Sequence, residues 1–254
     1  MLLHGFAHTG RQFDRLVAHA GLRGRASCLE LPFHRAPPAS SFARAVAACW
    51  QQVDAIDAGP VALLGYSLGA RVALAMALAR PARVSRLFAV AGHPGLASSS
   101  ERRARRAADA GWQALLRSQG TAAFLRAFRR QALFGPPHAR ETERGSRAWR
   151  AREQLDPLAL AAAFDVLGLA AMPCYRPRLG RLRMPAWFVA GEHDDKFRRL
   201  TEATAAACPD GRATVAPRAH HDVIADAGDW LGAQLSAWLS PSAGDQSASS
   251  AGAE

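Results

Sequence analysis

The chain has 254 residues, of which 49% are hydrophobic and 21% are charged, so it can bury one substantial core and is near the upper length of a single domain. No uncharged apolar run approaches the roughly 18 residues that a membrane-spanning helix needs, so we expect a soluble protein with no membrane span. The four cysteines lie far apart without metal-ligand spacing, and no secretory or transit signal precedes the first strand. These features exclude a disulfide scaffold and favour a cytoplasmic location.

The net charge of +11 is the unusual feature of the composition. Lys196 is the only lysine among 32 cationic residues, so part of the excess reflects a source rich in arginine. The segment 101–152 holds thirteen arginines and four acidic residues, which places a net +9 of the +11 in one stretch. This stretch has no recognised nucleic-acid motif and no interleaved stacking aromatics, so we disfavour a nucleic-acid-binding module and predict no nucleic-acid partner.

Strand-like and helix-like segments alternate at the two ends of the chain. In the first part, apolar periodicity predicts strands over 1–3, 26–31, 61–64 and 84–90, and helices over 12–19, 40–56 and 67–80. From about 97 to about 178 the pattern is helical, with breaks at Gly120 and at Gly135-Pro136-Pro137. In the last part, the pattern predicts strands over 186–190 and 213–215 and helices over 196–208 and 229–239.

This alternation predicts an α/β fold in which helices cover both faces of a mostly parallel sheet. We expect one core built from residues 1–96 and 181–239, a helical lid at 97–180, and a disordered tail at 240–254. Ligands of such sheets bind outside the carboxyl ends of the strands, so a helical insertion after a strand is placed to cover a site there.

A GxSxG motif at 65–69 lies between a predicted buried strand and a predicted helix. A tight turn with small flanking residues holds the serine exposed at a helix N-terminus, which makes Ser67 a candidate nucleophile rather than an ordinary turn residue. The turn at 4–6 follows the first strand, and the backbone N–H of Phe6 could bind an oxyanion together with that of Leu68.

Candidates for the acid and the base follow the last two predicted strands. Asp194 is the candidate for the acid that orients an imidazole, with Glu192 and Asp195 as competitors, because carboxylates in a loop are more often solvated than catalytic. His220 and His221 complete the order Ser, Asp, His, and either could be the base.

From about Leu2 to Leu239, the sequence resembles the α/β-hydrolase superfamily and, within it, the 2-succinyl-6-hydroxy-2,4-cyclohexadiene-1-carboxylate synthase family of menaquinone biosynthesis. The resemblance rests on several stretches: Leu3-His4-Gly5-Phe6, the serine motif with Arg71, Gly92-His93-Pro94-Gly95-Leu96, the Arg-rich helix ending at Trp112, Gln131 with Phe134, and Gly191-Glu192-His193-Asp194-Asp195-Lys196-Phe197. The second glycine-rich stretch and the acidic stretch are much more specific than the serine motif.

The resemblance implies a role for each site residue. Pro217-Arg218-Ala219-His220-His221 is similar to the family's PRAGH, which places His221 on the catalytic histidine. The implied substrate-binding residues are Tyr66, Arg71, Arg105, Phe128, Gln131 and Arg152. By charge alone, Arg71 could instead pair with a local acid, and Arg105 and Arg152 could be solvated cations.

Several positions depart from the family pattern. Phe128 replaces a tryptophan, Ala70 a common glycine, Phe33 a turn glycine and Ile224 a second histidine, so the shape of the pocket is expected to differ. The additional strand pair that usually opens this fold has no counterpart before Met1.

The resemblance implies a lyase that eliminates pyruvate from 2-succinyl-5-enolpyruvyl-6-hydroxy-3-cyclohexene-1-carboxylate, with Ser67 as the base that removes a ring proton. Three arginines suit a small substrate with three carboxylates. No cofactor or metal is expected, and the protein is expected to be a monomer or a small homo-oligomer. The alternative is a serine esterase or related hydrolase that acts on a small anionic ester.

Overall fold

The computed structural model describes residues 1–31, 40–136 and 147–239. Six strands form one sheet in the order β2-β1-β3-β4-β5-β6, and every neighbouring pair is parallel. The strands are β1 (Leu2–Leu3), β2 (Cys28–Leu29), β3 (Val61–Tyr66), β4 (Val84–Val90), β5 (Ala186–Gly191) and β6 (Gly211–Ala216). This sheet confirms the predicted α/β fold.

Successive residues of the central strands face opposite sides of the sheet, and both sides are apolar. On one side, Leu63 belongs to the larger buried cluster with residues of α2 (Phe42–Ile56) and α3 (Leu68–Ala79). On the other side, its neighbour Leu64 belongs to a second cluster with residues of α1 (Asp14–His19) and α9 (Gly228–Leu239). Strands buried on both faces read as continuous apolar runs, which is why β3 and β4 are legible in the sequence.

The remaining helices of the core flank the last strands. Helix α7 (Asp195–Ala206) follows β5 and packs against β5 and β6, while the single turn α8 (Val223–Asp226) precedes α9. Two 3-10 turns, η1 (Gly10–Phe13) and η2 (Pro81–Arg83), complete the core.

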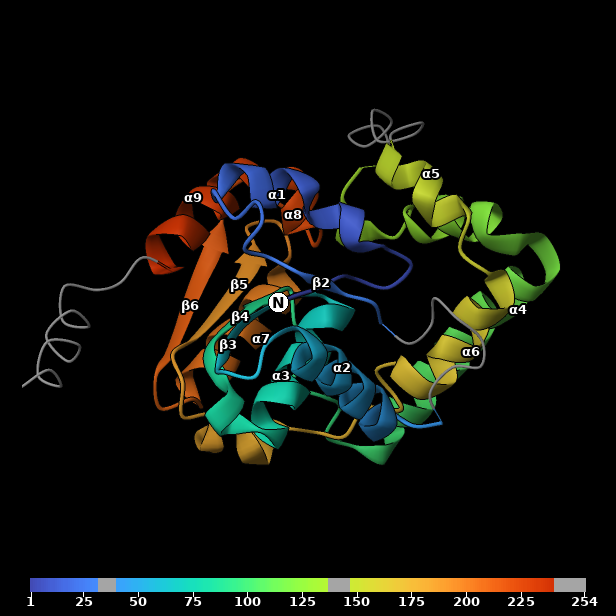
Figure 1. Ribbon diagram of the computed structural model, residues 1–254. Coiled ribbons are helices and arrows are strands. Elements are labelled where there is room, and N and C mark those ends of the chain that lie inside the picture. Colours follow the sequence, from blue (N-terminus) through green and yellow to red (C-terminus); the bar gives the residue numbers. More distant parts are fainter. Residues whose placement is uncertain (32–39, 137–146, 240–254) are drawn as a thin grey trace, which may run out of the picture.

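The segment between β4 and β5, for which we keep the name lid, contains α4 (Ser99–Phe128), η3 (Ala132–Phe134), α5 (Arg147–Glu153), α6 (Pro157–Leu167) and η5 (Arg176–Arg181). A capping box of Ser98 and Glu101 begins α4, and Gly120, with φ of 77°, bends it where the sequence predicted a break. The Gln113 amide donates to the Ala161 carbonyl over 2.9 Å and so joins α4 to α6. Figure 1 shows α4, α5 and α6 as a separate helical layer beside the sheet.

Both β3 and β6 are longer than the sequence predicted, and two further elements differ more clearly. The strand predicted over 26–31 shortens to β2, because the Ala26 N–H bonds to Leu22 and the Glu30 N–H to the Gln52 side chain instead of to a strand. Helix α8 was not predicted. The predicted turn at 32–34, Pro137 and the tail at 240–254 lie outside the described residues.

Within the described ranges, no helix is long and apolar enough to cross a membrane, and no three acidic, histidine or cysteine side chains gather as metal ligands.

Candidate active site

Ser67 lies on a strained turn between β3 and α3. Its φ of 52° and ψ of −106° are unusual for a residue with a side chain and present the hydroxyl at the start of the helix. The two flanking glycines are required by space: a Cβ on Gly65 would lie 2.3 Å from the Gly69 carbonyl oxygen, and one on Gly69 only 1.9 Å from that of Leu3. The turn therefore depends on all three small residues of the motif.

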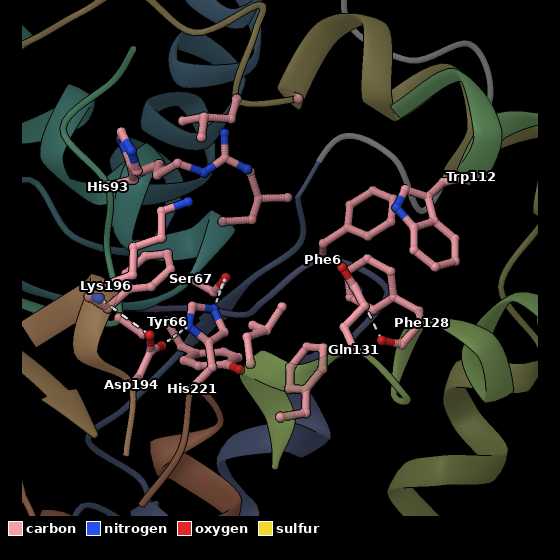
Figure 2. Close-up of a pocket in the computed structure, with 18 of the residues that line it drawn as sticks. Phe6, Tyr66, Ser67, His93, Trp112, Phe128, Gln131, Asp194, Lys196 and His221 are labelled. Carbon is pink, nitrogen blue, oxygen red and sulfur yellow. Dashed lines mark hydrogen bonds and ion pairs between the residues drawn. The ribbon is translucent and has the colours of Figure 1, made fainter. Parts of the chain in front are cut away.

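Three side chains from three different loops form one hydrogen-bonded chain (Figure 2). The Ser67 Oγ lies 3.1 Å from His221 Nε2, and His221 Nδ1 lies 2.8 Å from Asp194 Oδ2. The other oxygen of Asp194 accepts the Phe197 N–H over 3.2 Å and thereby caps α7. Because a carboxylate only accepts, Nδ1 carries the imidazole proton, and Nε2 is free to accept the proton of the serine.

The competing residues have partners elsewhere. Glu192 accepts the Arg218 N–H over 2.6 Å, and exposed Asp195 pairs with Arg198 over 3.3 Å. The His220 N–H donates to Asp226. The structure thus brings Asp194 and His221, rather than these neighbours, to Ser67.

Aromatic rings surround the imidazole of His221. The ring centroid of Phe197 lies 4.4 Å away, and those of Phe134 and Tyr66 each lie 5.8 Å away. His221 and Asp194 are only 4% and 6% exposed, so their hydrogen bond is shielded from water.

The turn after β1 places Phe6 at the same cavity as Ser67. The Gly5 N–H donates to the Gln12 side chain over 3.0 Å, and the Gly5 carbonyl accepts the His8 N–H, so the turn is held on both sides. Leu68 opens α3, where backbone N–H groups lack intrahelical acceptors. Phe6 and Leu68 remain the candidates for the oxyanion hole.

A cavity of about 490 Å³ opens above Ser67 and is lined by both the core and the lid. In Figure 2, His93 and Lys196 lie on one side of Ser67, and Phe6, Trp112 and Phe128 lie on the other. One end of the cavity is cationic, because the charges of Lys196, Arg71 and Arg105 lie near His93 there, and the other end is aromatic. Ser67 lies between them.

All three predicted arginines line this cavity. Arg71 donates to the Leu167 carbonyl over 2.8 Å, and burial lowers its pKa to about 9, with a smaller contribution from the charge of Arg105. Arg105 pairs with Asp109 over 2.8 Å, and Asp109 is itself buried, which raises its pKa. At this end of the cavity, one carboxylate thus faces two guanidinium groups.

Arg152 reaches the cavity from α5. It is buried, so the alternative of a solvated cation, which its charge alone left open, does not apply. It is 4% exposed, and its Nε donates to the Ala7 carbonyl over 2.7 Å. Its guanidinium also lies 5.1 Å from the Trp149 ring centroid. The hydrogen bond from Arg152 to Ala7 ties the lid to the turn that carries Phe6.

A family model described as the alpha/beta hydrolase family matches residues 1–233, which is most of the chain. The chain belongs to the alpha/beta hydrolase family.

Sequence relatives of this chain include proteins with one shared name. A 2-succinyl-6-hydroxy-2,4-cyclohexadiene-1-carboxylate synthase of Salmonella arizonae is 29% identical over 211 residues, covering 82% of each chain. The synthase of Enterobacter sp. strain 638 is 38% identical over 144 residues, covering 56% of this chain and 55% of the relative. The resemblance seen in the motifs therefore extends through most of the sequence.

Solved structures share the fold of this chain. MenH from S. aureus superposes with a TM-score of 0.83 at 22% identity, covering 94% of this chain and 91% of that chain. A thermophilic esterase from Thermogutta terrifontis superposes with a TM-score of 0.74 at 20% identity, covering 94% and 88%. At these identities the likeness establishes the fold alone.

Several residues that line the cavity were not predicted as site residues from the sequence. Lys196, His93, Asp109 and Trp112 lie there without having been singled out. His93 accepts the Gly95 N–H at Nδ1, and burial lowers its pKa to about 3, so it is neutral at pH 7 with its proton on Nε2. His93 and Lys196 lie inside motifs that carried the resemblance, and that position was the available signal.

Phe128 and Gln131 shape the aromatic end. The Gln131 amide donates to the Phe128 carbonyl over 2.9 Å, and the Phe128 ring lies 5.4 Å from that of Trp112 and 6.2 Å from that of Phe6. Tyr66 lies below Ser67 with its ring beside His221, so it borders the triad rather than the aromatic end.

Proposed function

We propose that this hydrolase-fold protein is a carbon–oxygen lyase that eliminates pyruvate from 2-succinyl-5-enolpyruvyl-6-hydroxy-3-cyclohexene-1-carboxylate, giving 2-succinyl-6-hydroxy-2,4-cyclohexadiene-1-carboxylate. The proposal rests on one observation above all. Four cationic side chains, Arg71, Arg105, Arg152 and Lys196, line a single cavity that also holds Ser67.

The charge balance of the cavity favours a polyanionic ligand. Among the described residues, Asp109 is paired with Arg105, Asp194 with His221, and Asp195 with Arg198 on the surface. Burying the Arg71 guanidinium with only a backbone carbonyl as its hydrogen-bond acceptor is costly, and a substrate carboxylate would offset that cost. A neutral ester would not offset the cost of burying the Arg71 guanidinium.

In the proposed reaction, His221 accepts the proton of Ser67, and Asp194 stabilises the imidazolium that forms. The Ser67 oxygen then removes the ring proton of the substrate, and the electron pair released breaks the C–O bond to the enolpyruvyl group without an acyl-enzyme. The group leaves as the enolate of pyruvate, which takes a proton from the His221 imidazolium to give pyruvate, so Ser67 and His221 return to their starting states. The N–H groups of Phe6 and Leu68 stabilise the enolate charge that develops. The aromatic end holds the ring, and the cationic end holds carboxylates, while Arg152 reaches a further carboxylate from the side of the turn that carries Phe6.

An esterase acting on a small anionic ester is the second candidate. The same triad supports it, because a serine activated by histidine beside an oxyanion hole is also the arrangement for acyl transfer. In that case Ser67 attacks the ester carbonyl, and an acyl-enzyme forms.

Incubating the purified protein with the enolpyruvyl substrate and measuring pyruvate by a coupled dehydrogenase assay tests the proposal. We expect pyruvate release well above a buffer blank and its loss in Ser67→Ala. That variant abolishes either activity, so Arg105→Met separates them: it should slow pyruvate release but spare the hydrolysis of a neutral aryl ester. No pyruvate, together with rapid turnover of aryl esters, would refute the lyase.

A further inference from the structure

The short lid segment that follows α4 holds the loop that carries His221. The His221 N–H donates to the Leu133 carbonyl over 3.0 Å, although the two residues belong to the core and to the lid. The next lid residue, Phe134, lays its ring edge-on to the imidazole, with the planes at 77°. The backbone and the ring of His221 therefore both rest on this segment.

A buried ion pair fastens the same two segments together. Arg129 donates to Asp222 Oδ2 over 2.8 Å, and their side chains are only 8% and 2% exposed. The other carboxylate oxygen of Asp222 accepts the Ala225 N–H and begins α8. The Arg129 guanidinium also lies 5.2 Å from the Phe134 ring centroid. One cation thus contacts both the residue after His221 and the ring beside it.

Stability alone does not account for this pair. Removing two charges from water is costly, and apolar residues of similar volume often serve as well or better in a protein interior. Neither Arg129 nor Asp222 is among the residues that line the cavity, so neither is placed to touch a substrate there. What the pair does contribute is a fixed distance between the lid segment and the loop of His221.

We propose that Arg129 and Asp222 are positioning residues, which hold the His221 imidazole within hydrogen-bond distance of Ser67 and couple the placement of the lid to that geometry. This rests on the proposed use of Ser67 and His221 in catalysis. A displacement of about 1 Å in a catalytic group can cost about 100-fold in rate. Loss of the pair should therefore reduce the reactivity of Ser67 itself, whatever the substrate.

The test compares Asp222→Asn, Arg129→Met, the double variant that carries both changes, and Arg129→Lys. The first readout is the second-order rate of Ser67 phosphonylation by a fluorophosphonate, and the second is hydrogen exchange of peptides covering 129–134 and 219–223. We expect phosphonylation to slow about 10- to 100-fold in both single variants and in the double variant. Exchange of the two peptides should accelerate about tenfold, and Arg129→Lys should retain most of the wild-type rate.

The double variant separates positioning from bulk stability. It removes both charges of the pair together, so its melting temperature should recover relative to either single variant while Ser67 stays slow. Leu235→Ala, a buried change in α9, is the matched control: it lowers the melting temperature and should leave phosphonylation at 25 °C unchanged.

The proposal would be overturned if Ser67 of the double variant is phosphonylated at the wild-type rate. It would also be overturned if hydrogen exchange of the two peptides is the same in the variants as in the wild type. A wild-type protein whose Ser67 does not react at all would instead count against the proposed function. In that event, the exchange of the two peptides still decides whether the pair holds the loop.

Discussion

Replacing Arg71 by methionine should make the protein more stable and a poorer catalyst. Arg71 projects from α3 to the cationic end of the cavity and has the Leu167 carbonyl, 2.8 Å away, as its hydrogen-bond acceptor. Burial is the main reason that its pKa falls to about 9, and the nearby charge of Arg105 lowers it further. Methionine is similar in length, carries no charge and suits an apolar wall.

The size of the effect follows from that pKa. A fall from the ordinary value to about 9 corresponds to roughly 5 kcal/mol of cost for the charged form, at about 1.36 kcal/mol per pKa unit. The variant also loses the hydrogen bond to the Leu167 carbonyl, which lowers the free energy of unfolding by about 1.5–3 kcal/mol because the donor is charged. The variant should therefore gain about 2–3.5 kcal/mol in the free energy of unfolding, which is about 4–14 °C in melting temperature for a chain of this size.

The size of this cost depends on pH. Below pH 9, Arg71 is charged in both the folded and the unfolded chain, so the whole cost is present at pH 7. Above pH 9 the folded state begins to release this proton while the unfolded state keeps it, so the cost shrinks as the pH rises. The stabilisation by Arg71→Met should accordingly be largest at neutral pH.

Thermal unfolding followed by circular dichroism at pH 7, with and without the polycarboxylate product, measures both effects. Free wild-type protein should melt below the variant, and added product should raise the melting temperature of the wild type much more than that of the variant. The KM for pyruvate release should rise about 10- to 100-fold. Arg15→Met, which removes an exposed arginine that pairs with exposed Asp229 away from the cavity, is the matched control and should change neither quantity much.

Equal or lower stability of Arg71→Met, with an unchanged KM, would refute the reasoning. It would mean that the guanidinium is not held in the cavity at a cost that the substrate offsets.

Three further outcomes follow from the described contacts. Asp194→Asn removes the acceptor that fixes the imidazole tautomer, so kcat for pyruvate release should fall about 10⁴-fold with little change in KM. Gly69→Ala should give insoluble protein, or protein that is unfolded by circular dichroism, because the new Cβ would meet a β1 carbonyl. Gly111→Ala, where the new Cβ lies in open space on α4, should instead raise the free energy of unfolding by about 0.5–1 kcal/mol. His93 has a pKa of about 3 when folded and near 6.5 when unfolded, so the unfolded chain binds its proton first as the pH falls. Stability should thus fall by about 2 kcal/mol between pH 6.5 and pH 5 through this group, and urea unfolding of His93→Gln should lack that part of the loss.

Much of the core was legible in the sequence because its signals are local. Strands buried on both faces read as apolar runs, and the predicted span 84–90 coincides with β4. The order of Ser67, Asp194 and His221 could be anticipated because each follows a strand, and parallel strands end at one edge of the sheet. The Arg105 and Asp109 pair was within reach too, since the two are four residues apart on one helix.

Contacts between the lid and the core could not be anticipated in this way. Arg129 was one of thirteen arginines in its segment, and its partner Asp222 is 93 residues away with no local signal to connect them. The same holds for Arg152, whose bond to Ala7 spans 145 residues. Such pairs are set by how the lid packs on the sheet, which periodicity does not encode.

The walls of the cavity have separate origins. Ser67, Asp194 and His221 stand on loops that leave the sheet, whereas Trp112, Phe128 and Gln131 come from α4 and the segment after it. A mutant library confined to those three lid positions would therefore change which molecule is held while leaving the reacting groups in place. For an engineer seeking new substrates, the lid is the part to randomise, with Arg129 kept constant so that the catalytic loop keeps its support.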